Sequence, residues 1–335
     1  MRILLIGGSG LISTPITRFL LERGDDVTLY NRGQTPLRVD GVVQQVAGDR
    51  DDFPAFEAQI AGLGRFDCVI DMVCFTPAQA ESAVRACAGR TTQFIFCSTV
   101  DVYTRPAPSY PYCEDSPRDA VSDYGRNKAA CEDIFLTAHA RGDFAATIIR
   151  PAMTYGEGGP IVHTFGWSTT YLDRMRKGKP IVVHGDGQSL WVTCHVDDVA
   201  RAFVAAVANE RTYGKAYHTA GNNWMTWNQF HAGVAQALGV ALPRLVHIPT
   251  DVLSAIAPER ANITIFNFQY DTIFDTGAAQ ADLGFVQTIG WVEGVRRTVA
   301  WLDANRPLAN SDLDPYEDRL IEAWDRLVRM LPADE

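Results

Sequence analysis

A tyrosine and a lysine stand four positions apart in the segment SDYGRNKAACE, residues 122–132. Residues at this spacing lie one above the other on a helix face, so Tyr124 and Lys128 would be neighbours if the segment is helical. A phenol beside an ammonium can exchange protons, because a positive charge stabilises the phenolate. The same pair could also be two solvated side chains. Its meaning depends on the elements that position it.

The first 150 residues alternate apolar runs with helical patterns. Helical patterns at 13–24 and 76–90 separate strand-like runs at 2–8, 26–32, 68–75, 93–100 and 146–152. Runs that are apolar on both faces and separated by helices predict a parallel sheet covered on both sides. We therefore expect an α/β fold, a Rossmann-type doubly wound parallel sheet with a smaller mixed α/β lobe.

The rhythm changes after Pro151, where the turn-rich segment TYGEGGP begins a mixed region. The last segment contains an amphipathic helix pattern at 315–331, which could dock on the protein itself or on another subunit. We predict a dinucleotide-binding domain over 1–160 with a return segment at about 193–221, a substrate-binding lobe from 161–192 and 222–310, and a C-terminal helix in 311–335.

The glycine-containing segment IGGSGLIS follows the first strand-like run and opens a helix pattern. Gly7 and Gly10 would allow a tight turn and the close approach of a pyrophosphate, which amides at the helix N-terminus would hold. Leu11 and Ile12 belong to this predicted cofactor-binding turn. Ser13 stands where a third glycine is usual, and it is small enough to keep the helix near the strand.

The end of the second strand-like run suggests the type of dinucleotide. An acidic residue there would bind a ribose 2′-hydroxyl, but the chain has Asn31 and Arg32, which favour a 2′-phosphate. We therefore favour NADP slightly without excluding NAD. Asp49, in AGDRDD, suits an adenine amino group, and its neighbour Arg50 joins the predicted cofactor-binding set.

Composition excludes several classes of protein. The net charge of −10 argues against broad binding to nucleic acid or to a membrane surface, and no stretch approaches the roughly 20 apolar residues of a membrane span. The short apolar N-terminus fits a strand better than a signal peptide. Seven cysteines without a CxxC pair suit reduced thiols in a cytoplasmic protein without a metal site. The basic run RMRKGKP, 174–180, fits cations at a helix C-terminus better than a phosphate or RNA patch.

The glycine turn, the strand FIFCSTVDVY and the segments DYGRNK, RPAMTYG and HVDD occur in one order along the chain. Together they resemble the extended short-chain dehydrogenase/reductase family, of the NAD-dependent epimerase/dehydratase type. The segment GDGQSLWVTCHVDDVARAF is also similar to the branch that contains chloroplast stem-loop-binding proteins. The resemblance implies an NAD(P) cofactor, a small sugar-type substrate and a homodimer formed through helices near 76–90 and 124–140.

The same resemblance assigns roles to three residues. Tyr124 would be the general acid/base that faces a substrate hydroxyl. Lys128 would supply the charge that brings the phenol's pKa towards working pH, and it would bind the nicotinamide ribose. Thr99 would form a hydrogen bond with the reacting oxygen.

The resemblance also implies that four residues flank the nicotinamide. Pro151 and Met153 would lie on one side of the ring, and the backbone of Met72 and Val73 on the other.

Two departures from the family pattern limit the choice of substrate. Where sugar-nucleotide members carry an arginine, this chain has Leu190 and Trp191, and a tryptophan cannot grip a diphosphate although it can stack on a sugar. Dehydratases carry two acidic residues after the threonine, and this chain has only Asp101, either a second acid/base or a structural carboxylate. His163 could face substrate, but we favour a histidine that lies at the surface or caps a helix.

These observations predict an NAD(P)-dependent oxidoreductase of the sugar epimerase/dehydratase type, acting through a keto intermediate. A simple dehydrogenase or ketoreductase shares the first step and is an alternative. A second alternative is a cofactor-binding protein that associates with RNA or regulates a partner, for which the acidic charge is unfavourable.

Overall fold

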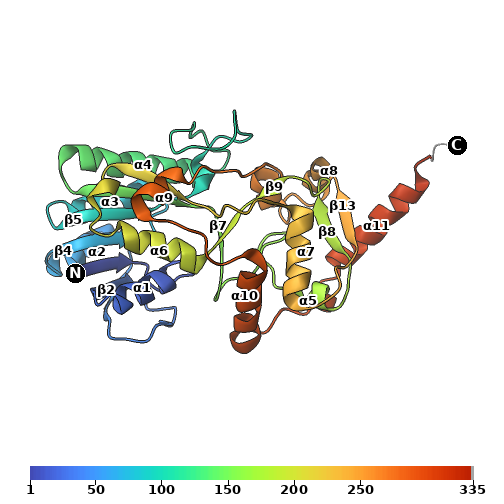
Figure 1. Ribbon diagram of the computed structural model, residues 1–335, viewed down its shortest axis with the longest axis horizontal. Coiled ribbons are helices and arrows are strands. Elements are labelled where there is room, and N and C mark those ends of the chain that lie inside the picture. Colours follow the sequence, from blue (N-terminus) through green and yellow to red (C-terminus); the bar gives the residue numbers. More distant parts are fainter. Residues whose placement is uncertain (333–335) are drawn as a thin grey trace. The chain divides into compact units, whose positions relative to one another are not determined.

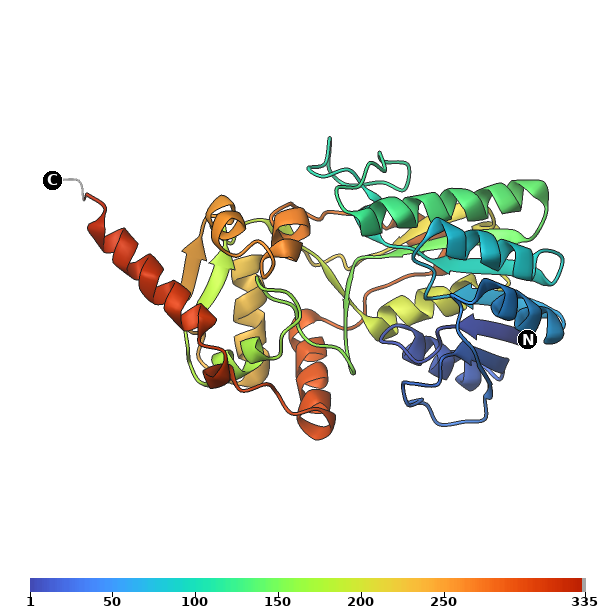
Figure 2. The ribbon, with the colours of Figure 1, turned by 180° about the vertical axis from the view of Figure 1, so that it is seen from behind.

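A computed structural model describes residues 1–332 and divides the chain into two compact units. Unit 1 comprises Met1–Thr154, Thr193–Asn222 and Phe274–Thr288, and unit 2 comprises Tyr155–Val192, Asn223–Ile273 and the residues from Ile289 onward. Figures 1 and 2 show the elements of both units from opposite sides.

Unit 1 is built on a seven-stranded sheet in which every pair of neighbouring strands is parallel (Figure 1). Its spatial order is β11-β6-β5-β4-β1-β2-β3. The strand order reverses between β1 and β4, which is the switch point where doubly wound sheets bind ligands. The predicted fold class is confirmed. The strands are β1 (Arg2–Ile6), β2 (Asp26–Asn31), β3 (Gln44–Ala47), β4 (Phe66–Asp71), β5 (Thr91–Cys97), β6 (Ala145–Pro151) and β11 (Lys215–Thr219).

Helices cover both faces of this sheet because its strands are apolar on both sides. In β1, Ile3 and Leu5 pack into one core cluster while Leu4 and Ile6 pack into the other, as the alternation of a strand requires. Each such side chain contributes about 1.5–3 kcal/mol when fully buried. One face carries α1 (Ser13–Glu22), α6 (Val196–Ala206) and α9 (Gly277–Leu283), and the other carries α2 (Phe53–Gly62), α3 (Pro77–Cys87) and α4 (Asp123–Arg141).

Short elements complete unit 1. They are η1 (Val100–Val102), β7 (Met153–Tyr155), whose last residue belongs to unit 2, β10 (Thr193–His195) and η2 (Glu210–Thr212).

The segment 274–288 belongs to unit 1, whereas we expected all of 222–310 in the second lobe. Its helix α9 is held by polar contacts that the sequence pattern does not display. The carboxylate of Asp282 accepts hydrogen bonds from Tyr217 Oη (2.8 Å) and Lys215 Nζ (2.9 Å), and the Asp282 carbonyl accepts from Asn209 (2.8 Å). These contacts fix α9 against β11 and η2.

Unit 2 combines two small strand pairs with helices. Strands β8 (Ile181–His184) and β13 (Leu245–Ile248) are parallel, and β9 (Leu190–Trp191) and β12 (Met225–Thr226) are antiparallel. The helical elements are α5 (Thr170–Arg176), α7 (Trp227–Leu238), α8 (Thr250–Ile256), the π-helix η3 (Thr264–Phe268), α10 (Trp291–Asn305), η4 (Ser311–Leu313) and α11 (Tyr316–Met330).

The last helix, α11, is docked along only part of its apolar stripe. Ile321 is buried and Leu320 and Trp324 pack beside it against the β8–β13 core, whereas Leu327 and Val328 are about half exposed. Figure 2 shows the C-terminal half of α11 extending away from the rest of the unit. The predicted C-terminal segment also included 333–335, which lie outside the described residues. Within residues 1–332, no helix combines the length and the apolar character that a membrane span needs.

Candidate active site

The glycine turn connects β1 to α1 and can be formed only by residues without bulk. Gly7 has φ +85°, and a Cβ at this position would lie 2.5 Å from Cγ1 of Val73. Its amide donates to the carbonyl of Tyr30 (2.9 Å). The amide of Gly10 donates to Oγ of Ser13 (2.7 Å). The serine that replaces the usual third glycine of the motif therefore stabilises the turn.

A pocket of about 270 Å³ lies in unit 1 at the carboxyl ends of β1, β4, β5 and β6. We call it the unit 1 pocket. Ten predicted site residues line it: Gly7, Gly10, Leu11, Ile12, Met72, Val73, Thr99, Tyr124, Lys128 and Pro151. Six further residues complete the lining: Ser13, Phe75, Cys97, Ser98, Ala152 and Thr154.

Tyr124 lies in the first turn of α4, which Ser122 caps by accepting a hydrogen bond from the amide of Gly125 (3.1 Å). The tyrosine is 43% exposed, whereas Thr99 is buried at the N-terminus of η1. Burial of the phenol and then the carboxylate of Asp101 raise the pKa of Tyr124, and a hydrogen bond with Thr99 opposes this shift. The phenol is therefore protonated at neutral pH.

Gly125 allows the start of α4 to approach η1 closely. A Cβ on this residue would come within 3.0 Å of both the carbonyl oxygen of Asp101 and the side chain of Ala120. Real Cβ atoms essentially never show such contacts, so the backbone of α4 can sit here only because residue 125 is glycine. This approach fixes Tyr124 relative to Thr99.

Lys128 lies one turn further along α4 and is fully buried. Its ammonium donates to the carbonyls of Cys74 (2.9 Å) and Cys97 (2.6 Å) and lies 4.5 Å from the ring centroid of Phe96. Burial and the carboxylate of Asp101 are the largest causes of the raised Tyr124 pKa, and the lowering of this pKa by Lys128 stays a prediction. The main-chain carbonyls hold the charge of Lys128 at the pocket wall.

Three residues predicted to bind the adenosine half do not line the unit 1 pocket. Asn31 ends β2, and its Oδ1 accepts a hydrogen bond from the amide of Gly33 (2.9 Å). Arg32 and Asp49 are exposed. Their part in cofactor binding stays a prediction.

Arg50, also placed in the cofactor-binding set, is buried and does not line the pocket. Its guanidinium binds the carboxylate of Asp71 (2.7 Å) and the carbonyl of Gln79 (3.0 Å). Asp71 in turn accepts a hydrogen bond from the amide of Val73 (3.0 Å), the residue that packs against Gly7. Arg50 thus stabilises the pocket wall through Asp71 and Val73. An arginine in a polar turn gives no sequence signal for this structural role.

Two other predicted residues of unit 1 are not among the pocket lining. Met153 lies in β7, and its neighbours Ala152 and Thr154 line the pocket instead, as expected when alternate side chains of an extended segment face opposite sides. Asp101 is paired with Arg105 (3.0 Å).

His163 and Trp191 lie in unit 2 and are both buried. His163 is stacked on Tyr171, with ring centroids 5.0 Å apart, so the interpretation as a surface histidine is wrong. Trp191 packs among aromatic rings, with centroids 5.1 Å from Trp227 and 4.9 Å from Phe268.

Sequence reasoning missed a buried polar network that joins α4, β6 and β11. Arg150 of β6 binds Glu132 of α4 (2.6 Å) and donates to the hydroxyl of Tyr103 (2.6 Å), which bonds to His218 of β11. Burial lowers the pKa of His218 to about 4, so it is neutral. The sequence offers no signal for this network, because its four residues belong to separate segments of the chain.

The residues of the unit 1 pocket fit a dinucleotide. Gly7 and Gly10 carry no side chain in the turn that a pyrophosphate would approach, and a buried ammonium lies in the pocket wall. Within residues 1–332, no group of three or more His, Cys, Asp or Glu side chains could hold a metal ion.

The fold and this pocket define a dinucleotide-binding enzyme of the extended short-chain dehydrogenase/reductase type. The profile of the NAD dependent epimerase/dehydratase family matches residues 3–219. The chain belongs to this family, as its motifs predicted.

Known proteins resemble this chain over most of its length. The 2'-dehydrokanamycin reductase of Streptomyces kanamyceticus is 27% identical over 93% of this chain and 88% of its own length. The chloroplast stem-loop binding protein of 41 kDa b from Arabidopsis thaliana is 28% identical over 73% of this chain and 65% of its own, which confirms the predicted similarity to that branch. The UDP-glucuronic acid 4-epimerase of Bacillus cereus, solved in complex with NAD, has the same fold, with a TM-score of 0.71, 18% identity and coverage of 91% and 99% of the two chains.

Proposed function

We propose that this enzyme interconverts an alcohol and a ketone on a sugar or sugar-derived substrate, with Tyr124 exchanging a proton with the reacting oxygen. One observation carries the proposal. The phenol of Tyr124 and the ammonium of Lys128 come from α4, the hydroxyl of Thr99 comes from the start of η1, and all three line the same pocket. A general acid of this kind contributes typically 10²–10⁴-fold to rate.

The residues of the unit 1 pocket divide into two groups under this proposal. The glycine turn, Met72, Val73 and Pro151 would hold an NAD(P) molecule, which supplies or accepts hydride when bound. Thr99 would orient the substrate oxygen, and Tyr124 would give or take its proton. Lys128 would hold a positive charge beside both.

Tyr124 is protonated at neutral pH, which suits donation of a proton to a ketone oxygen. This supports a ketoreductase as a second candidate beside the epimerase type. The Streptomyces kanamyceticus relative is named as a reductase, and no nucleotide appears in the name of the compound that it reduces. The two candidates share the proton transfer. In an epimerase the ketone stays bound and rotates before it is reduced again, whereas a ketoreductase binds the ketone from solution and releases the alcohol.

The residue environment argues for a substrate without a nucleoside diphosphate. Trp191, where an arginine would be expected, is buried among aromatic rings and offers no cation. Dehydration is also disfavoured, because Val100 is buried and Asp101 is paired with Arg105. These residues leave no pair of acidic groups to remove and return the elements of water.

We further propose NADP in preference to NAD, because Arg32 is an exposed cation just after β2 and no carboxylate occupies the position of Asn31. A homodimer through α3 and α4 is supported by a groove between these helices, in which charged residues surround Val84, Ile134 and Thr137: Glu81, Arg85, Asp133 and Arg141. A cytoplasmic location is supported by seven cysteines that are all free.

A substrate panel tests the proposal. Free sugars, sugar phosphates, their keto derivatives and UDP-sugars are offered with each dinucleotide, while absorbance of the nicotinamide and NMR of the products are followed. Net change of the cofactor indicates a reductase or dehydrogenase, and a new stereoisomer without net change indicates an epimerase. Turnover of UDP-sugars alone would contradict the interpretation of Trp191, and no turnover with any carbonyl or alcohol would contradict the proposed function.

A further inference from the structure

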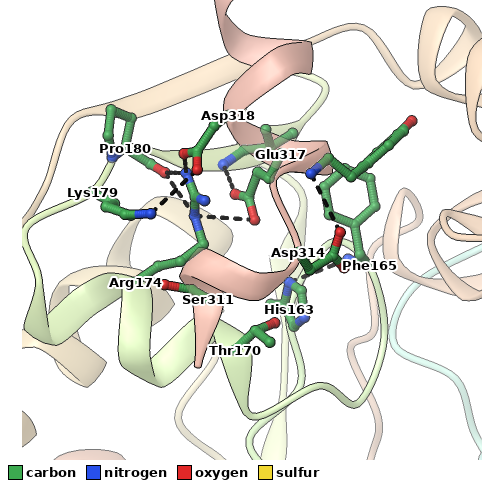
Figure 3. A network of polar contacts seen from close by, with 12 residues as sticks. His163, Phe165, Thr170, Arg174, Lys179, Pro180, Ser311, Asp314, Glu317 and Asp318 are labelled. Atoms are coloured by element: carbon green, nitrogen blue, oxygen red, sulfur yellow. Dashed lines mark hydrogen bonds and ion pairs between the residues drawn. The ribbon is translucent and has the colours of Figure 1, made fainter. Parts of the chain in front are cut away.

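A second hollow lies wholly within unit 2, and the proposed reaction does not use it. This cavity, of about 60 Å³, is enclosed by the segment that contains His163, by α5 and by the first turn of α11. We call it the unit 2 cavity. Figure 3 shows Arg174 joined to Glu317 and Asp318, with His163, Ser311 and Thr170 close to this network.

Two buried nitrogen atoms of the cavity lining have no hydrogen-bond partner among the described residues. They are Nη1 of Arg174, a residue 1% exposed, and Nε2 of His163, a residue 3% exposed. A buried polar group left unpaired costs about 1–3 kcal/mol, so such groups are rare unless something binds them.

Both atoms are hydrogen-bond donors. A guanidinium nitrogen can only donate. Burial and the charge of Arg174 lower the pKa of His163 to about 3, so its imidazole is neutral. Its Nδ1 accepts a hydrogen bond from the amide of Phe165 (3.4 Å), which leaves the proton on Nε2. The cavity therefore presents donors and requires an acceptor.

The carboxylates around the cavity do not meet this requirement, because each has donors of its own. Asp314 is bound by Arg260 (2.8 Å). Glu317 accepts from the amide of Val182 (2.8 Å) and is paired with Nε of Arg174 (3.2 Å). Burial raises the pKa of Glu317 to about 7, so this carboxyl can be neutral, and the charge of Arg174 is then balanced only by its pairing with Asp318 (2.8 Å).

The mouth of the cavity also carries a cation. The side chain of Arg260 is 48% exposed, and its guanidinium lies 4.3 Å from the ring centroid of Tyr316. The hydroxyls of Ser168 and Thr170 line the interior. Because of its small volume the cavity would admit an ion or a few water molecules, but not a nucleotide.

We propose that the unit 2 cavity binds one small oxyanion through Nη1 of Arg174 and Nε2–H of His163, with Arg260 at its mouth. Phosphate and small carboxylates share the acceptor oxygens that this arrangement needs. The site is separate from the unit 1 pocket, and its occupancy does not depend on the proposed reaction.

Calorimetric titration of the full-length protein with sodium phosphate, at ionic strength held constant with NaCl, tests the proposal. We expect one saturable event that persists when the unit 1 pocket is saturated with dinucleotide, since the glycine turn could itself take phosphate. Sodium acetate is titrated in parallel, and tighter binding of acetate would assign the site to carboxylates. If the heats of titration with phosphate and with acetate are both no larger than those with NaCl, the proposal is wrong, and the cavity holds only water.

Two variants place the event in the unit 2 cavity. His163→Phe keeps an aromatic ring on Tyr171 but removes the Nε2 donor, and it should weaken binding about fivefold to tenfold. Arg260→Met is at an exposed position where folding is little affected, and it should weaken binding a few-fold. His231→Phe is the matched control, because its Nε2 is also unpaired and buried but does not line the cavity. Unchanged affinity in both test variants would show the proposal to be wrong.

Discussion

The unit 1 pocket and the unit 2 cavity differ in the groups that give them their shape. In the unit 1 pocket, Gly7 and Gly10 leave room by having no side chain, and two main-chain carbonyls hold the ammonium of Lys128. In the unit 2 cavity, Arg174 and Glu317 meet from α5 and α11 and hold each other. Main-chain geometry therefore shapes the first hollow, and long charged side chains shape the second.

This difference predicts different responses to change. The order of strands and turns determines the shape of a pocket that is formed by the backbone. Such a pocket should lose ligand binding mainly when a substitution adds an atom that collides with the chain. A cavity made by ion pairs should respond to pH and to the loss of single charges. The following experiments test this contrast, from the largest expected effect to the smallest.

Tyr124→Phe should lower kcat by about 10²–10⁴-fold, because the proton donor of the unit 1 pocket is removed while its shape is kept. Dinucleotide affinity, measured by fluorescence titration, should stay within about twofold of the original, since the ring remains. Tyr110→Phe, at a tyrosine of similar exposure (41%) outside the pocket lining, is the control and should retain full turnover. Full turnover by Tyr124→Phe would end the catalytic assignment.

Gly7→Ala should lower the free energy of unfolding by about 2–3 kcal/mol and weaken dinucleotide binding, because it combines a positive φ with a collision against Val73. Gly24→Ala separates these two effects. Gly24 has nearly the same φ, +86°, and nothing within 4 Å of the added Cβ, so only about 1 kcal/mol should be lost. Chemical denaturation and ligand titration of both variants give the comparison. Equal losses would show that the close approach to Val73 is unimportant.

The unit 2 cavity should make stability depend on pH through Glu317. Its surroundings are Arg174 from α5, the amide of Val182 from β8, and the carboxylates of Asp318 and Asp314, and burial raises its pKa from 4.5 to about 7. Between about pH 4.5 and pH 7 the folded protein keeps a proton on Glu317 that the unfolded chain releases. The free energy of unfolding therefore falls as pH rises through this range, by about 1–3 kcal/mol from this group.

Urea unfolding between pH 4.5 and 8 measures this slope. Glu317→Gln should flatten it, since the amide does not titrate. Glu322→Gln, at an exposed position of the same helix, should leave it unchanged. A slope in Glu317→Gln as steep as the original would show that other groups cause it.

Arg32→Ala should have the smallest effect, a loss of about threefold to tenfold in kcat/KM for NADP with little change for NAD. An exposed cation contributes only about 1 kcal/mol to binding of a phosphate group. Arg65→Ala serves as the control, because Arg65 immediately precedes β4 and so lies at the amino end of that strand, whereas the pocket is at the carboxyl ends. Equal losses for NAD and NADP would argue against recognition of a 2′-phosphate.

The sequence predicted the unit 1 pocket because its determinants are local. Strand, glycine turn and helix follow one another between residues 2 and 22, and the spacing of Tyr124 and Lys128 is visible in one helix. The edge strand β3 was not predicted, because its sequence QQVA is short, polar and mostly exposed. Met153 was placed in the pocket although its two neighbours line it, since a resemblance does not fix which side of an extended segment faces a site.

The unit 2 cavity could not be predicted, because its parts are far apart in the chain. Arg174 and Glu317 are separated by α6 to α10, and no periodic pattern relates them. The basic run 174–180 was interpreted as cations at a helix end. In the structure its four cations are all in ion pairs, and Arg174 is buried.

Gly125 has a consequence for how this enzyme can be altered. Because the chain at Asp101 touches the start of α4 where a side chain would stand, this close backbone contact, together with the hydrogen bond between Tyr124 and Thr99, keeps the helix bearing the phenol in register with the segment bearing the threonine hydroxyl. A larger residue at position 125 would push α4 away from η1. It would thereby separate the phenol of Tyr124 from the hydroxyl of Thr99 without changing either residue. Engineering of new substrates into this scaffold should therefore leave this glycine untouched and vary the residues around it.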